Sequence, residues 1–193
     1  LTVVSPRSWP SDVFNVVSHG SARNALAAAR ANGGGIVLFP RGTYTFDENS
    51  TLDDIPPRTV VAGEAAELVS LHWKDMDNPP PALTTGANGS WLLTNLTIHV
   101  ALNFHAIVSD SRQHDVRVIG VRIRSNPQYY LMPGPDPAFR GRNATCGHSY
   151  AQGEALRLVG KNFEVANCDI FHGGQHLLSI DPHGPTTGTD GPS

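Results

Sequence analysis

Five side chains that can transfer a proton or bind a metal lie within fifteen positions near the end of the chain: Asp169, His172, His176, Asp181 and His183. Two carboxyl groups at a suitable separation can serve as acid and base in glycoside cleavage, one of them with a raised pKa. We therefore predict Asp169, Asp181 and His172 as catalytic residues, with His172 as a general base or metal ligand. Two glycines between His172 and His176 exclude the helical two-histidine motif of zinc proteases. Surface or turn histidines are the alternative interpretation.

Arg122 is the second candidate for chemistry, because a guanidinium group binds the carboxylate of an acidic sugar in a bidentate manner. The repeat described below places Arg122 beside Asp169 on the outer face of a sheet, close enough to form an ion pair. We predict Arg122 as a catalytic residue on this basis. A solvated Arg–Asp pair that stabilises the sheet face is the alternative, since exposed pairs are common and weak.

Five further residues are predicted to bind substrate: Arg124, His99, Tyr129, Tyr130 and His176. The first two fall at the next outward position of the repeat, and the last belongs to the histidine cluster. The two tyrosines can stack on sugar rings, and they lie in a long Pro- and Gly-rich insert at residues 126–153. Because loops of this length inside compact domains are often functional, we expect the insert to form a wall of a substrate groove. A decorated surface loop is the alternative.

An internal repeat organises the second half of the chain. Segments 91–98, 116–123 and 163–170 each alternate apolar and polar residues on either side of a small turn residue. These turn residues are Asn95, Gly120 and Asn167. The first two lie 25 residues apart, and the insert accounts for the larger spacing to the third. A period near 25 with several short strands and no helix predicts the coils of a parallel β-solenoid, which stack about 4.8 Å apart.

Stacked coils place equivalent residues in columns. The predicted inward columns are Trp91, Val116 and Phe163; Leu93, Val118 and Val165; Leu96, Val121 and Cys168; and Ile98, Ile123 and Ile170. The predicted outward columns are Thr97, Arg122 and Asp169, followed by His99, Arg124 and Phe171. Cys168 is expected in the core as a small apolar residue, with a disulfide bond to Cys146 in the insert as the alternative.

The first half of the chain predicts one helix followed by short strands. Ser21 can cap a helix over residues 21–31, in which small apolar residues recur at helical spacing. Three glycines at residues 33–35 end this helix, because glycine tolerates the left-handed turn after a helix C-terminus. The runs 36–39 and 43–46 then have the length and composition of strands.

Residues 34–46 (Gly-Gly-Ile-Val-Leu-Phe-Pro-Arg-Gly-Thr-Tyr-Thr-Phe) and 56–64 (Pro-Pro-Arg-Thr-Val-Val-Ala-Gly-Glu) resemble the N-terminal part of the pectate-lyase-like superfamily. The later repeats are similar to the generic coil of that superfamily, so the resemblance covers about residues 13–181. It implies an all-β fold, a single right-handed parallel β-helix capped by the N-terminal helix. Because such domains have more coils, we expect this one to be truncated at its C-terminus, with residues 182–193 as a Pro/Gly/Thr-rich tail.

The resemblance implies carbohydrate chemistry more than one reaction, since the superfamily includes lyases, glycosidases, epimerases, phage tailspikes and non-catalytic modules. Its lyases use an arginine base with calcium held by aspartates, so calcium is the expected cofactor if this chain is a lyase. Polygalacturonases carry an aspartate pair after the strand that matches residues 167–170, where this chain has Phe171 and His172. We expect a polysaccharide-cleaving glycosidase ahead of a lyase. A non-catalytic glycan-binding or structural module is the alternative.

Composition limits the remaining classes. The chain has 193 residues with 19 Gly and 15 Pro, and its charged share of 16% lies below the usual value of about 25%. This composition disfavours a helical bundle and is too apolar for disorder. A net charge of −3 gives no basic footprint for nucleic acid, and no apolar run has the length of a membrane span. Four Asn-x-Ser/Thr sequons, a mild excess over chance, favour a secreted protein: Asn49, Asn88, Asn95 and Asn143.

Overall fold

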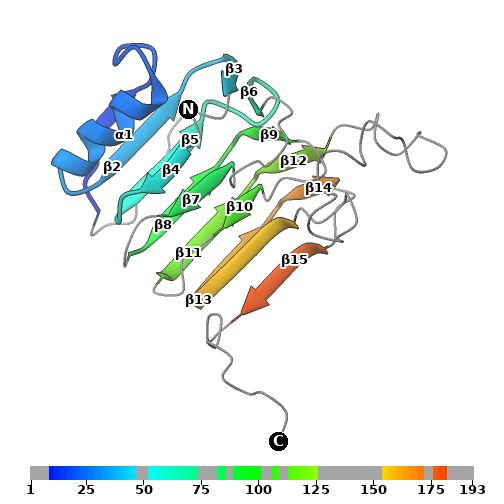
Figure 1. Ribbon diagram of the computed structural model, residues 1–193. Helices are drawn as coiled ribbons and strands as arrows, with labels where there is room; N and C mark the ends of the chain where they lie inside the picture. Colours follow the sequence, from blue (N-terminus) through cyan, green and yellow to red (C-terminus); the bar gives the residue numbers. More distant parts are fainter. Residues whose placement is uncertain are drawn as a thin grey trace, which may run out of the picture.

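The computed structural model (Figure 1) describes residues 9–46, 52–73, 82–85, 89–100, 106–108, 113–125, 154–171 and 176–181. Within these ranges the chain forms one α-helix and fifteen strands. All strand pairings found there are parallel. The predicted all-β class with parallel strands is thus confirmed. The insert 126–153, the tail 182–193 and the sequons at Asn49, Asn88 and Asn143 lie outside the described residues.

The helix α1 (Ala22–Ala31) forms where the sequence predicts it. The side chain of Ser21 accepts a hydrogen bond from the backbone N–H of Asn24 at 3.1 Å and so caps the helix N-terminus. The small apolar face of α1, at Ala25, Leu26 and Ala29, is buried. It packs beside the first strands of the sheet, where Figure 1 shows it at the N-terminal end of the strand stack.

The described strands form two sheets. The larger sheet has the order β1 (Val13–Asn15), β2 (Gly35–Phe39), β5 (Thr59–Gly63), β8 (Trp91–Thr94), β11 (Gln113–Ile119), β13 (Glu154–Ala166), β10 (Ile107–Val108), β7 (Leu83–Thr85) and β4 (Leu52–Ile55), and β15 (His176–Asp181) pairs with β13. The smaller sheet has the order β14 (Asp169–Phe171), β12 (Arg122–Ser125), β9 (Thr97–Val100), β6 (Val69–Trp73) and β3 (Gly42–Phe46).

Successive strands visit these sheets in a repeating order of three. The sets β2-β3-β4, β5-β6-β7 and β8-β9-β10 each contribute a strand to one arm of the larger sheet, then one to the smaller sheet, then one to the other arm. Corresponding strands of consecutive sets are hydrogen-bonded neighbours. The long strand β13 belongs to both arms, because its first part pairs with β10 and β15 and its second part pairs with β11.

The register of these strands confirms the predicted columns. Val118 pairs with Leu93 on one side and with Val165 on the other. Ile123 pairs in the same way with Ile98 and Ile170. The first two members of every inward column are buried in one continuous apolar core.

Burial decreases in the third repeat, where the sequence predicts an equally buried column member. Val165 is 36% exposed, and Phe163, Cys168 and Ile170 are only partly buried. The reason is the position of the repeat, since the second part of β13 and all of β14 have a described strand neighbour on one side alone. The residues of the third repeat therefore stay in register with their columns, but they are less buried than the first two members.

Cys168 is a free thiol that packs against the apolar core from a half-buried position. Its Sγ atom lies 3.3 Å from the backbone carbonyl oxygens of both Val118 and Ala166, and its single S–H is shared between these two acceptors. The predicted core position is thus partly correct. The alternative was a disulfide bond to Cys146. Cys146 lies outside the described residues.

In the described part, α1 is the single helix, and it is neither long nor apolar enough to cross a bilayer.

Candidate functional site

A column of three turn residues positions the candidate site. Asn95, Gly120 and Asn167 have φ angles of 57°, 65° and 53°, the left-handed region that asparagine and glycine tolerate best. The backbone N–H of Gly120 donates to the carbonyl of Ala166 at 2.9 Å, which links adjacent turns. We call these three residues the turn column. Each turn directs the chain from the larger into the smaller sheet.

Side chains beyond the turn column alternate between the core and the outer face of the smaller sheet. Arg122 is paired in register with Thr97 and Asp169. Arg124 is paired in register with His99 and Phe171. The predicted outward columns are therefore confirmed, and Arg122 and Asp169 are cross-strand neighbours as expected.

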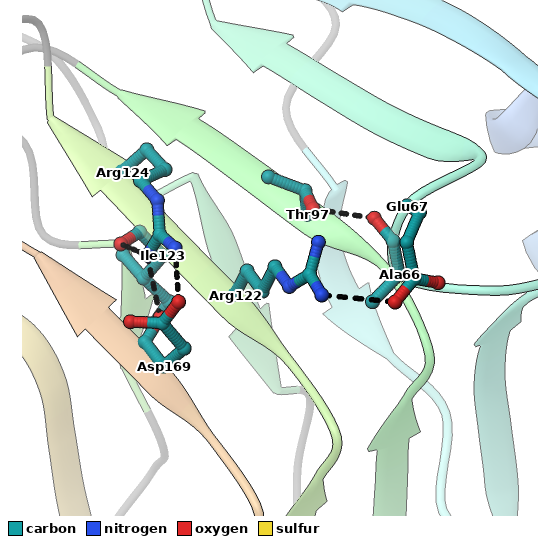
Figure 2. A network of polar contacts seen from close by, with 7 residues as sticks. All are labelled: Ala66, Glu67, Thr97, Arg122, Ile123, Arg124 and Asp169. Carbon is teal, nitrogen blue, oxygen red and sulfur yellow. Dashed lines mark hydrogen bonds and ion pairs between the residues drawn. The ribbon is translucent and has the colours of Figure 1, made fainter.

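The ion pairs on this face differ from the predicted one. Arg122 Nη2 lies 2.9 Å from the Oε1 atom of Glu67, and Arg124 forms the ion pair with Asp169. Figure 2 shows the two guanidinium groups pointing in different directions, Arg122 toward Glu67 and Arg124 toward Asp169. The expected Arg122–Asp169 pair is thus wrong, because a carboxylate from another part of the chain reaches Arg122.

Arg124 holds the carboxyl group of Asp169 in its ionised form. The guanidinium group of Arg124 also donates hydrogen bonds to the backbone carbonyls of Ile123, at 3.1 Å, and of Asp169, at 2.8 Å. These bonds hold the Arg124 side chain against the strands β12 and β14. The hydrogen bond from Arg124 is the largest influence on the pKa of Asp169 and lowers it; desolvation opposes this shift, and the positive charges of Arg124 and Arg122 lower the pKa further. Asp169 can therefore act as a base, nucleophile or hydrogen-bond acceptor, and it is a poor proton donor.

Glu67 belongs to a loop at residues 64–68 that joins β5 and β6. Gly63 aligns with Asn95 and Ser70 pairs with Thr97, so this connection is five residues longer than the equivalent one after Asn95. The hydroxyl of Thr97 donates to the carbonyl of Ala66 at 2.6 Å. Together with the Arg122–Glu67 ion pair, this bond ties the loop to the outer face of the sheet.

A pocket of about 370 Å³ lies between this loop and the sheet. Residues 65–67 line it on the loop side, and the turn column lines it together with Arg122 and Asp169. Its polar groups are thus two carboxylates, one guanidinium group and two side-chain amides. Such a mixture of donors and acceptors can bind a ligand that carries several hydroxyl groups.

Two histidines lie next to Arg124 on the same face. The imidazole rings of His72 and His99 are stacked, with ring centroids 4.1 Å apart and an angle of 15° between the planes. Burial lowers the pKa of His72. Burial, and then the charges of His72 and Arg124, lower the pKa of His99 to about 4. Both histidines thus favour the neutral form, in which they can donate and accept hydrogen bonds near neutral pH.

Two further predicted site residues, His176 and Asp181, have their backbone in the other sheet. His176 begins β15 and Asp181 ends it, so their backbone belongs to the larger sheet. Asp169 belongs to the smaller sheet, and the predicted pair of Asp169 and Asp181 is therefore not brought onto one sheet. His172, Tyr129 and Tyr130 lie outside the described residues, as does His183.

A calcium site does not follow from the residues on this face. The carboxylates of Asp169 and Glu67 are both ion-paired with arginines. Among the residues that the structure describes, no group of three or more His, Cys, Asp or Glu side chains is arranged to hold a metal ion. We therefore derive no step through calcium.

Sequence reasoning missed Glu67 and His72, which both lie in the repeat before the three that were aligned. The turn there has Gly63 in place of asparagine, and the 64–68 loop lengthens the spacing from Gly63 to Asn95 to 32 residues. A signal was present nonetheless, because residues 59–62 form a short, mainly apolar strand before a small residue, as residues 91–94 do, and the two strands pair in register. Extending the repeat backwards with an allowed insertion would have found both residues.

Comparison of the chain with protein-family models, curated proteins and solved structures finds no match. The resemblance of residues 13–181 to the pectate-lyase-like superfamily thus stays a prediction. Evidence for a function comes from the outer face of the smaller sheet, with its two arginines, its ionised aspartate and its pocket.

Proposed function

We propose that this chain is a secreted, carbohydrate-active protein, a right-handed parallel β-helix that binds an extended polysaccharide on the outer face of its smaller sheet and cleaves it. The three-strand repeat with parallel pairing between successive sets supports the β-helix. The observation that carries the function is the pocket beside Arg122 and Asp169, because it places an ionised carboxylate next to a concave polar surface.

The outer face offers the contacts that an extended glycan needs. Outward side chains from successive strands repeat about every 4.8 Å, so a polymer that crosses the strands meets a new side chain at each step. The column of His99 and Arg124 ends at Phe171, a residue that is 57% exposed. An exposed aromatic ring can pack against the apolar face of a sugar ring, while the polar groups bind its hydroxyls.

The proposed roles in cleavage follow from the charge states. Asp169, held ionised by Arg124, supplies the base or nucleophile, and Arg122 orients the glycan beside it. Glycoside hydrolysis also needs a proton donor. His172 is the nearest predicted candidate in the sequence, three residues after Asp169.

A second candidate function is glycan binding without cleavage. The specific observation in its favour is that the two carboxyl groups of the pocket, on Asp169 and Glu67, are both ion-paired with arginines, so neither is suited to donate the proton that hydrolysis needs. The ion pairs of Arg122 and Arg124 fit a binding surface equally well.

Cleavage assays with the 193-residue chain separate these two functions. We expect a polysaccharide panel to show new reducing ends with one substrate class, and Asp169→Asn to reduce that rate at least a hundredfold. Absorbance of unsaturated products identifies a lyase instead of a glycosidase. The control is Glu164→Gln, since Glu164 forms an equivalent exposed ion pair with Arg117, at 3.4 Å, on the larger sheet. Binding without new ends, in all substrates, would leave the glycan-binding function.

A further inference from the structure

The pocket beside the 64–68 loop has a charge pattern that limits its ligand. Its guanidinium group, on Arg122, is already ion-paired with Glu67, and its second carboxylate, on Asp169, is already ion-paired with Arg124. An anionic ligand would have to displace Glu67 while facing Asp169, and a cationic ligand would compete with the two arginines. A neutral ligand with many hydroxyl groups avoids both costs, because each hydroxyl can donate to a carboxylate and accept from a guanidinium group or amide.

We infer that this pocket is a subsite for a single neutral pyranose unit of the polysaccharide, and not for a uronate unit. The inference rests on the proposed function and narrows its substrate class. Its volume of about 370 Å³ lies at the lower end of the range for small-molecule sites. The pocket therefore suits one sugar unit at a corner of the groove better than a long chain segment.

The shape of the pocket depends on the middle member of the turn column. Asn95 and Asn167 both carry side chains there, whereas Gly120 between them carries none and leaves a notch. A Cβ atom at Gly120 would lie 3.1 Å from the Oδ1 atom of Asn95, so any side chain at this position enters the space beside that amide. The notch places the two amides on either side of a bound sugar.

The loop side of the pocket also leaves space for a ligand. Ala65 and Ala66 present small side chains, while the Thr97–Ala66 bond and the Arg122–Glu67 pair hold the loop in place. The five extra residues of this connection thus build one wall of the subsite. In the equivalent turn after Asn95 the chain passes directly into β9 and forms no such wall.

The first test measures which sugars bind. Methyl β-galactopyranoside and methyl β-glucopyranoside are titrated into the chain and followed by amide shifts in NMR spectra, in parallel with galacturonate and glucuronate. We expect at least one neutral glycoside to bind saturably with shifts at Asn95, Gly120 and Asn167, and both uronates to bind at least tenfold more weakly. Stronger binding of a uronate, or no saturable shift at the turn column with any probe, would overturn the inference.

The second test fills the notch with a residue that the turn geometry tolerates. Gly120→Asn places at this turn the residue that already adopts a positive φ at the two neighbouring turns. We expect a folded chain with a modestly lower melting temperature, because the Asn95 side chain must shift away from the new Cβ atom, and at least a tenfold loss of affinity for the neutral glycoside. Ala65→Leu fills the pocket from the loop side and should cause a similar loss. Unchanged affinity in both folded variants would disprove the proposed location.

The third test changes the charge balance of the pocket. Glu67→Gln releases Arg122 from its carboxylate partner, so we expect uronate affinity to rise at least tenfold and affinity for the neutral glycoside to fall. The matched control, Glu164→Gln, removes a carboxylate from the Arg117 pair and should change neither. Equal behaviour of the two variants would show that the charge pattern does not select the ligand.

These outcomes are distinguishable from failure of the proposed function. Cleavage of a polysaccharide with no monosaccharide shifts at the turn column would support the proposed function and overturn the subsite. Shifts at the turn column that Gly120→Asn removes, without cleavage of any polysaccharide, would support the subsite and leave glycan binding as the function.

Discussion

The outer faces of the two sheets differ sharply in composition. On the larger sheet, Ile36, Val60 and Leu92 form a buried apolar cluster against which Trp9 packs. On the smaller sheet, the corresponding face carries ion pairs, stacked imidazoles and a polar pocket. The outer face of the larger sheet is thus apolar and buried at β2, β5 and β8 and becomes polar at the exposed Arg117–Glu164 ion pair, whereas the outer face of the smaller sheet presents groups that can bind a polar ligand.

The strands of the two sheets show the same difference in their sequences. The strands β2 and β5 are almost continuously apolar, which is typical of strands that are buried on both faces. The strands β6 and β9 alternate between buried and partly exposed positions along most of their length. In strands where buried and partly exposed residues alternate, one face is open to solvent. This is the face on which a ligand can bind.

The largest expected effect concerns the inner face that both sheets share. Ile123 is fully buried between Ile98 and Ile170, so Ile123→Ala should lower the free energy of unfolding by about 2–5 kcal/mol. Ile170→Ala, in the same column but half-buried, should cost clearly less. Urea denaturation of both variants checks this order. An equal loss of unfolding free energy in the two variants would contradict the reduced burial of the third repeat.

The next effect compares the two outer faces directly. Val60 is buried with no exposed surface, and Val60→Asn should destabilise the chain by about 2–3 kcal/mol because its amide lacks hydrogen-bond partners there. His72→Asn, on the polar face of β6, the next strand in the chain, should change the unfolding free energy by about 1 kcal/mol or less. Melting temperatures of the two variants provide the measurement. A larger decrease in melting temperature for His72→Asn than for Val60→Asn would mean that the polar face contributes more to stability than the apolar face.

A smaller effect should appear as pH dependence of stability. The pKa of His99 is about 4 in the folded chain, below its ordinary value of 6.5, so the unfolded chain takes up the proton first. The contribution of neutral His99 to the free energy of unfolding is therefore fully present above about pH 6.5, and it is lost as the pH falls toward 4. His99→Asn should flatten this slope in urea titrations at pH 7, 6, 5 and 4.

The carboxyl group of Asp169 adds to this loss at still lower pH. Its pKa lies below the ordinary value of 3.8, so its contribution is present above that value and is lost as the pH falls further. A slope confined to pH values below 4 in the wild-type chain would contradict the assignment to His99.

The smallest expected effect is that of Cys168→Ser. The thiol already lies within hydrogen-bond distance of two backbone carbonyls in a half-buried position, and a serine hydroxyl can donate to either of them. We expect a loss of about 1 kcal/mol or less, measured by urea denaturation. A loss above about 3 kcal/mol would indicate that this position is as deeply buried as those of Leu96 and Val121 in the same column.

Much of the fold could be predicted because its signals are local. Ser21 and the glycines at residues 33–35 define the ends of α1, and the two-residue alternation around Asn95 and Gly120 defines the register of the strands. The reduced burial of Val165 could not be predicted in this way. Burial depends on which strands lie on both sides of a column, and alternation within one strand carries no such information.

The sequence by itself determined which residues face outward, because the period of two in a strand and a small turn residue together assign every side chain to one face. That reasoning placed Arg122, Arg124 and Asp169 on one surface. Only the tertiary structure decided how their charges pair. Glu67, which binds Arg122, lies 55 residues earlier in the chain, and its loop reaches the site through the folding of another repeat. A guanidinium group pairs with whichever carboxylate lies within its reach. The partner of Arg122 therefore depends on which loop the tertiary fold places beside it.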